Sequence, residues 1–152
     1  MTSDPQLRQM PDVNTLIAAA WPNHIHHDRA RRWLETESLN GWATCPMIQS
    51  GFLRISMNAT VVGQAATCAG ALALLKQYTS DSAHTLWESE ASPLTWPAWL
   101  QRRVQGYRQV TDATLLATAV DHGGVLVTLD AGVLTLLPEA HRSRVRVLVP
   151  DT

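Results

Sequence analysis

Residues 111–130 read TDATLLATAVDHGGVLVTLD, and this stretch decides the fold. Its first half repeats leucine, alanine and valine at helical spacing, and the HGG at residues 122–124 predicts the end of that helix. We expect Thr111 or Asp112 to cap the helix at its start. The VLVTL that follows is typical of a buried strand, with Asp130 at its carboxyl end. The stretch therefore predicts a helix that leads into a strand of a parallel sheet.

The alternation of strands and helices continues on both sides of this stretch. We expect strands at residues 10–11, 41–45, 84–87 and 145–149, and helices at residues 13–20, 27–37, 46–56, 67–78 and 98–106. The helix over 67–78 is expected to bury Ala71, Leu72 and Leu75 on one face. Alternating strands and helices with right-handed crossovers predict an α/β fold, a three-layer α/β/α sandwich with a mainly parallel central sheet.

Length and composition fit one globular domain. The chain has 152 residues, 45% of them hydrophobic and 16% charged, which is enough for a single core. We expect residues 1–9 to form a partly ordered leader and residues 10–150 to form the domain. A formal net charge of -1 excludes a whole-molecule basic field that would gather nucleic acid. No long apolar run and no basic-then-apolar start is present, so we expect a cytoplasmic protein with no membrane association.

The sequence indicates structural roles for the cysteines and for two of the tryptophans. Cys45 and Cys68 have no close metal-binding spacing, so we expect both to be small buried side chains. Trp33 and Trp42 are expected to fill the core or a dimer interface.

Two basic clusters and one histidine cluster leave alternatives open. Residues 24–28 read HIHHD, which resembles a transition-metal cluster, but we favour a loop that leads into a helix. Arginines at positions 29, 31 and 32 and at positions 142, 144 and 146 could follow RNA phosphates. A solvated edge-strand face explains residues 142–146 equally well.

Three aspartates stand where this fold places its sites. Asp12 and Asp130 each follow a strand, and Asp112 lies at a helix start. Sites in open α/β sheets form outside the carboxyl ends of the strands, so we expect the three carboxylates to meet there. They would raise one another's pKa values unless a cation lay among them, and Mg²⁺, with Mn²⁺ as a substitute, is the hard cation that prefers such ligands. The expected chemistry is phosphoryl transfer or phosphodiester hydrolysis.

Each aspartate also has a simpler structural interpretation. Asp12 and Asp112 could be helix caps, and Asp130 could be the first residue of a turn. A phospho-accepting receiver domain is disfavoured because it needs a late lysine and the only lysine is Lys76 in a mid-chain helix.

Three stretches carry a resemblance to a known family. PDVNTLIA, GWATCPMIQSGFLRIS and RQVTDATLLATAVDHGGVLVTLDAGV, at residues 11–18, 41–56 and 108–133, resemble the opening, middle and closing motifs of PIN-domain ribonucleases of the VapC toxin type. The resemblance implies a metal-dependent endoribonuclease that cuts structured RNA such as tRNA or rRNA and leaves 5′-phosphate and 3′-hydroxyl ends. It also implies a homodimer held inactive by a cognate antitoxin.

The family's metal-site acids match Asp12, Asp112 and Asp130. We expect Asp12 and Asp112 to hold Mg²⁺, and Asp130 to ligate a second ion or to orient the attacking water. Asn14 and Thr128 lie two residues from Asp12 and Asp130, so they are candidates for orienting these ligands through hydrogen bonds.

The chain departs from the family pattern at one position. Family members usually carry a further acid, commonly Glu, near the start of the helix at residues 46–56, but this chain has none between residues 43 and 56. Gln49 is the nearest polar residue, and an amide supplies no charge to a cation. The alternative function is therefore a catalytically impaired PIN-like module that binds RNA or an antitoxin.

Overall fold

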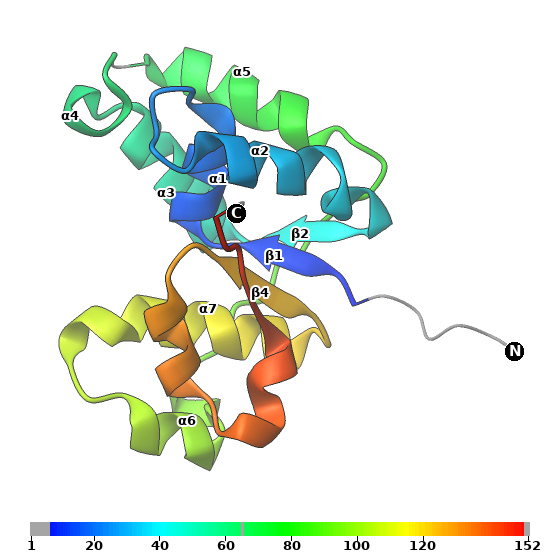
Figure 1. The fold of residues 1–152 in the computed structure, drawn as a ribbon, viewed down its shortest axis with the longest axis vertical. Helices are drawn as coiled ribbons and strands as arrows, with labels where there is room; N and C mark the ends of the chain where they lie inside the picture. Colours follow the sequence, from blue (N-terminus) through cyan, green and yellow to red (C-terminus); the bar gives the residue numbers. More distant parts are fainter. Residues whose placement is uncertain (1–6, 65, 151–152) are drawn as a thin grey trace, which may run out of the picture.

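A parallel sheet forms the centre of the molecule (Figure 1). The computed structural model describes residues 7–64 and 66–150. Within these residues the sheet has five strands, all parallel, in the order β3-β2-β1-β4-β5. The strands are β1 (Gln9–Pro11), β2 (Trp42–Thr44), β3 (His84–Leu86), β4 (Val125–Thr128) and β5 (Val145–Val147).

Helices cover both faces of the sheet (Figure 1). One face carries α1 (Val13–Ala20), α2 (His27–Glu35), α3 (Pro46–Ser56), α4 (Ala59–Val62) and α5 (Cys68–Thr79). The other face carries α6 (Ala98–Arg103) and α7 (Val110–Asp121). Short 3-10 turns complete the described chain: η1 (Glu37–Asn40), η2 (Pro93–Thr95), η3 (Tyr107–Gln109), η4 (Ala131–Leu136) and η5 (Glu139–Arg144). The predicted three-layer α/β/α sandwich is therefore confirmed.

The core explains why these segments fold where they do. Met10 of β1 is fully buried, and all four residues of β4 are buried, as expected for a strand covered on both faces. Trp33 and Trp42 are each 1% exposed and meet edge to face, with ring centroids 6.3 Å apart. The prediction of a buried role for both tryptophans is thus correct.

The predicted capping of α7 is wrong. The helix begins at Val110 after Gln109, and no side chain caps it. The reason is that η3 runs directly into α7, so the helix starts earlier than the sequence pattern indicates. Asp112 consequently lies in the first turn and has no capping bond of its own. The other end agrees with the prediction, because α7 ends at Asp121, His122 is its C-cap and Gly123 has a positive φ of 68°.

Two predicted buried side chains of α5 lie at the surface. Leu72 is 38% exposed and Cys68 is exposed, whereas Ala71 and Leu75 are buried as expected. The reason is that α5 packs mainly against α3, which covers only a narrow stripe of the helix. The short helix α4 has no sequence prediction, and α6 ends at Arg103 rather than at residue 106.

The remaining predictions concern the ends and the histidine cluster. Residues 1–6 of the expected leader lie outside the described residues, and its last residue, Gln9, belongs to β1. The HIHHD segment forms the expected loop into α2, where a ring nitrogen of His24 lies 3.0 Å from Asn14 Oδ1. Across residues 7–64 and 66–150, no helix has the length and apolar character needed to cross a membrane.

Candidate active site

The carboxyl ends of β1 and β4 lie at the point where the strand order reverses. From β1 the chain proceeds to β2 and β3 on one side and then crosses to β4 and β5 on the other side. Such a switch point leaves a crevice outside the strand ends, where ligands bind in open α/β sheets. Asp12 directly follows β1, and Asp130 lies just beyond β4.

Asp12 is a buried carboxylate held by the start of α1. It is 8% exposed, and its backbone N–H donates to Val127 O at 2.9 Å, which fixes its position beside β4. Its Oδ1 accepts the backbone N–H of Thr15 at 2.8 Å, so the residue is also the N-cap of α1. Burial raises the pKa of Asp12, while hydrogen bonds from Thr15 and Thr128 act in the opposite direction.

Asp130 is exposed and shapes the turn after β4. Its backbone N–H donates to Thr128 Oγ1 at 3.0 Å, and its Oδ1 accepts the N–H of Gly132 at 2.8 Å. The interpretation of Asp130 as the first residue of a turn is therefore correct. The hydroxyl of Thr128 also bonds the Asp12 side chain, so one buried threonine connects the two acids.

Asp112 lies in the first turn of α7, within electrostatic reach of Asp12 and Asp130. Burial, together with the negative charges of Asp12 and Asp130, raises the pKa of Asp112 to about 6. The structure thus brings the three aspartates that the sequence singled out into electrostatic contact. Because both neighbouring charges are negative, the arrangement costs free energy when all three groups are ionised.

The cluster is open rather than closed around one point. In the described part of the chain, no three His, Cys, Asp or Glu side chains lie close enough together to enclose a metal ion. The acids nevertheless present only oxygen ligands, which suit a hard cation. Mg²⁺ usually keeps several waters and takes one or two carboxylates, so an open acidic crevice fits it.

The side chains of the two remaining candidates, Asn14 and Gln49, make hydrogen bonds to residues other than the three acids. Asn14 is exposed and contacts His24. The Gln49 side-chain amide donates to Thr44 Oγ1 at 3.0 Å, and that oxygen lies 2.8 Å from His84 Nε2. Burial lowers the pKa of His84, which favours a neutral ring. Gln49 therefore belongs to a neutral hydrogen-bonded chain at the end of β2.

Sequence reasoning missed several of these partners. Thr15 had a local signal, because it lies at the third helical position, whose N–H an N-cap side chain accepts. Thr44 and His84 had none, because they are 40 residues apart and meet only through the pairing of β2 with β3.

Comparisons with known proteins agree with this architecture. The family model of the PIN domain matches residues 10–135. Ribonuclease VapC39 of Mycobacterium tuberculosis is 45% identical over 120 residues, which cover 79% of this chain and 86% of that protein. Ribonuclease VapC38 of the same organism is 41% identical over 137 residues, covering 90% and 95%. Ribonuclease VapC44 is 35% identical over 143 residues, covering 93% of this chain and 100% of the relative.

A solved structure shares the fold. The crystal structure of PAE2754 from Pyrobaculum aerophilum superimposes with a TM-score of 0.55 over 86% of this chain and 79% of that chain, at 20% identity. The parallel sheet with its acidic switch point thus defines an α/β protein of the PIN class. The chain belongs to the PIN-domain family and, within it, to the VapC-type ribonuclease toxins.

Proposed function

We propose that this chain is a metal-dependent endoribonuclease, the toxin of a type II toxin–antitoxin pair, which hydrolyses phosphodiester bonds in structured RNA such as tRNA or rRNA. The observation that carries the proposal is the cluster of Asp12, Asp112 and Asp130, where repulsion between carboxylates helps to raise the pKa of Asp112 to about 6. Such repulsion is relieved by a bound divalent cation.

Each acid has a distinct part in the proposed reaction. Asp12 and Asp112 hold Mg²⁺, or Mn²⁺ in its place, and the hydroxyl of Thr128 keeps Asp12 oriented. The ion supplies Lewis-acid polarisation of the scissile phosphate and lowers the pKa of the attacking water. Asp130 is exposed, so it is placed to orient that water or to ligate a second ion. Attack of the water oxygen on phosphorus would form the new phosphorus–oxygen bond and break the bond to the 3′-oxygen. The water would give a proton to solvent and the 3′-oxygen would take one from solvent, which leaves a 5′-phosphate and a 3′-hydroxyl.

Gln49 bears on how many ions bind. Its amide is engaged with Thr44 and contributes no charge, so we propose that the site holds one ion. The alternative, a PIN-like module that binds RNA or an antitoxin without cleaving, draws its support from the same missing acid.

Partners and organisation follow from the family. We propose that residues 10–150 form one domain, that a cognate antitoxin inhibits it, and that it works in the cytoplasm, where its RNA substrate is found. We also propose a homodimer. Exposed apolar side chains on the α3–α5 side, Met57, Val61 and Leu72, are candidates for its interface.

The test is cleavage of total tRNA and rRNA by the purified, antitoxin-free protein in Mg²⁺, Mn²⁺ or EDTA. Asp112→Asn removes one charge of the cluster, and Asp121→Asn is the matched control because it removes the same charge from the far end of α7. We expect discrete fragments that require metal, persist in Asp121→Asn and disappear in Asp112→Asn. Intact RNA under every condition, from a protein shown to be folded, would overturn the nuclease proposal and favour the binding module.

A further inference from the structure

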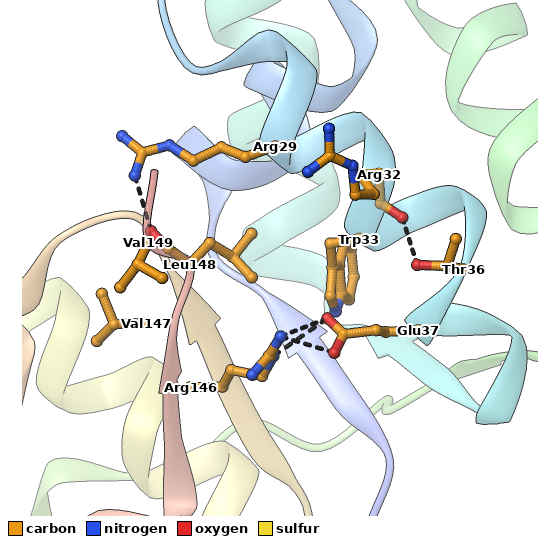
Figure 2. Close-up of a pocket in the computed structure, with 9 residues that line it drawn as sticks. All are labelled: Arg29, Arg32, Trp33, Thr36, Glu37, Arg146, Val147, Leu148 and Val149. Carbon is orange, nitrogen blue, oxygen red and sulfur yellow. Dashed lines mark hydrogen bonds and ion pairs between the residues drawn. The ribbon is translucent and has the colours of Figure 1, made fainter. Parts of the chain in front are cut away.

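A basic hollow lies between α2 and β5, and none of the three aspartates is among the residues that line it (Figure 2). Its volume is about 300 Å³, and we call it the arginine pocket. Arg29 and Arg32 of α2 line it from one side and Arg146 of β5 from the other, and Glu37 is the one acid among the described residues that line it. These described lining residues therefore include three guanidinium groups and one carboxylate.

Only some of the arginines in the two sequence clusters line the pocket. On α2, Arg31 turns away and pairs with Glu35 at 2.6 Å. In the second cluster, the Arg144 guanidinium donates to the backbone oxygens of Gly124 and Val120, which ties η5 to the end of α7. From these two clusters, Arg29, Arg32 and Arg146 line the pocket, which forms only because the fold places β5 beside α2.

Glu37 is held in the pocket by an ion pair that another anion can displace. Arg146 pairs with both carboxylate oxygens of Glu37, at 2.6 and 2.8 Å from Nη2 and at 3.1 Å from Nε. Their side chains are 45% and 37% exposed, and an exposed ion pair contributes little net free energy. A phosphate could therefore replace Glu37 at the Arg146 guanidinium, whose planar donors fit a phosphate equally well.

Hydrogen bonds connect the pocket to the catalytic edge. Arg29 Nη1 donates to Leu148 O at 3.0 Å (Figure 2), and the Leu148 N–H donates to Thr128 O at 2.9 Å. The Thr128 hydroxyl in turn bonds Asp130 and Asp12. Strands β4 and β5 are parallel, so their carboxyl ends lie at the same edge of the sheet. The part of the pocket beside the carboxyl end of β5 therefore lies at the edge that carries the acids.

The pocket continues at both ends. A hollow of about 270 Å³, lined by Ile25, His26, Asp28 and Pro150, shares Arg29 with it. Another of about 350 Å³, lined by Leu7 and Val125, shares Arg146. The three hollows follow one another along β5, the edge strand of the sheet, which favours an extended polymer over an isolated ion.

We propose that the arginine pocket binds a backbone phosphate of the RNA strand, distinct from the phosphate that is cleaved, and so positions the strand across the acidic crevice. This inference rests on the proposed ribonuclease function, because that function supplies the polyanion. It assigns the positioning of RNA to Arg32 and Arg146, and it makes Glu37 a competitor for the Arg146 guanidinium.

The test measures binding without cleavage. The full chain is titrated into a short fluorescein-labelled oligouridylate in EDTA, and fluorescence anisotropy is followed at several salt concentrations. Arg32→Gln should weaken binding by about three- to tenfold and reduce the slope of log K against log salt by about 0.7. Arg31→Gln removes the same charge from the same helix outside the pocket, so we expect its affinity to stay within about twofold of the parent.

Glu37→Gln separates a binding role from a structural one. If Glu37 served only to hold η1 against β5, its loss would weaken or not change binding. We expect stronger binding of the oligouridylate instead, by about threefold, with a steeper salt dependence. Equal effects of Arg31→Gln and Arg32→Gln, or no gain from Glu37→Gln, would overturn the proposal. Binding of an oligoglutamate peptide that depends on Arg32, without an effect on oligouridylate, would also overturn it and assign the pocket to an acidic protein segment.

The same variants keep the two proposals distinguishable. Metal-dependent cleavage together with Arg32-independent binding would reject the arginine pocket and leave the nuclease standing. Arg32-dependent binding of oligouridylate without cleavage in any metal would reject the nuclease and leave the pocket standing.

Discussion

The two sides of β1 handle polar groups at the same edge of the sheet in opposite ways. Toward β4, Asp12, Asp112 and Asp130 repel one another, and the pKa of Asp112 rises to about 6. Toward β2, the Gln49 amide, the Thr44 hydroxyl and the His84 ring form a neutral hydrogen-bonded chain. The acidic side is costly without a cation, whereas the neutral side is satisfied within the protein. The proposed nuclease function gives this costly arrangement a chemical role, which its contribution to stability does not.

The largest expected effect is on RNA cleavage and comes from removing a negative charge from the acidic side of β1. Asp12→Asn keeps the cap of α1, because Asn caps a helix about as well as Asp. We predict that RNA cleavage falls by about 100-fold or more, because several kcal/mol of electrostatic stabilisation are lost. Initial rates of tRNA cleavage at saturating Mg²⁺ measure this, with Asp121→Asn as the control. A rate within a few-fold of the parent would remove Asp12 from the site.

The neutral side should respond in stability instead. Thr44 is fully buried, and Thr44→Val leaves the Gln49 amide and the His84 ring without their shared partner. We predict a loss of about 1–3 kcal/mol in the free energy of unfolding, measured by urea denaturation. The exposed Thr60→Val is the matched control and should change little. Cleavage per folded molecule should change far less than in Asp12→Asn; an equal loss would mean that the two sides form one catalytic unit.

The stability of the metal-free protein should reveal the repulsion itself. The pKa of Asp112 is about 6 in the folded protein and 3.8 as the ordinary value, so its contribution to stability is complete below about pH 4 and is lost as pH rises through 6. Asp112→Asn should therefore stabilise the protein in EDTA at pH 7.5 by about 1 kcal/mol, or about 2–4 °C in Tm. The gain should disappear near pH 4. Differential scanning fluorimetry checks it, and a destabilised variant at pH 7.5 would argue against repulsion.

The smallest expected effect comes from adding an acid to the neutral side. Gln49→Glu supplies the charge that family members usually carry in this helix. We predict that the Mg²⁺ concentration for half-maximal cleavage falls by about threefold. Gln49→Ala, which adds no charge, is the control. An unchanged Mg²⁺ requirement in Gln49→Glu would show that this side of β1 does not reach the ion.

Local patterns predicted much of the fold and the three acids. The helix and strand of residues 111–130 have periodic apolar residues, and Asp12 and Asp130 follow strands directly. The predicted start of α7 was wrong because η3 runs directly into the helix. The prediction that Leu72 is buried was wrong because its exposure depends on which helix packs beside α5.

Contacts between distant segments had no sequence signal. The bond from Thr128 to Asp12 and the chain through Thr44 and His84 both need the strands to be paired. The pocket that Arg29, Arg32 and Arg146 line likewise needs β5 to lie beside α2. Such contacts arise from topology, which a periodic pattern in one segment does not encode.

Direct measurement of cation binding tests the central claim, that the three aspartates form the cation site. Mn²⁺ can be titrated into the parent, Asp112→Asn and Asp121→Asn in the absence of RNA, with free Mn²⁺ followed by electron paramagnetic resonance. We predict that Asp112→Asn weakens Mn²⁺ binding by about tenfold or more, while Asp121→Asn matches the parent. Equal Mn²⁺ affinity in the parent and Asp112→Asn would contradict the assignment of the acidic side of β1 as the cation site.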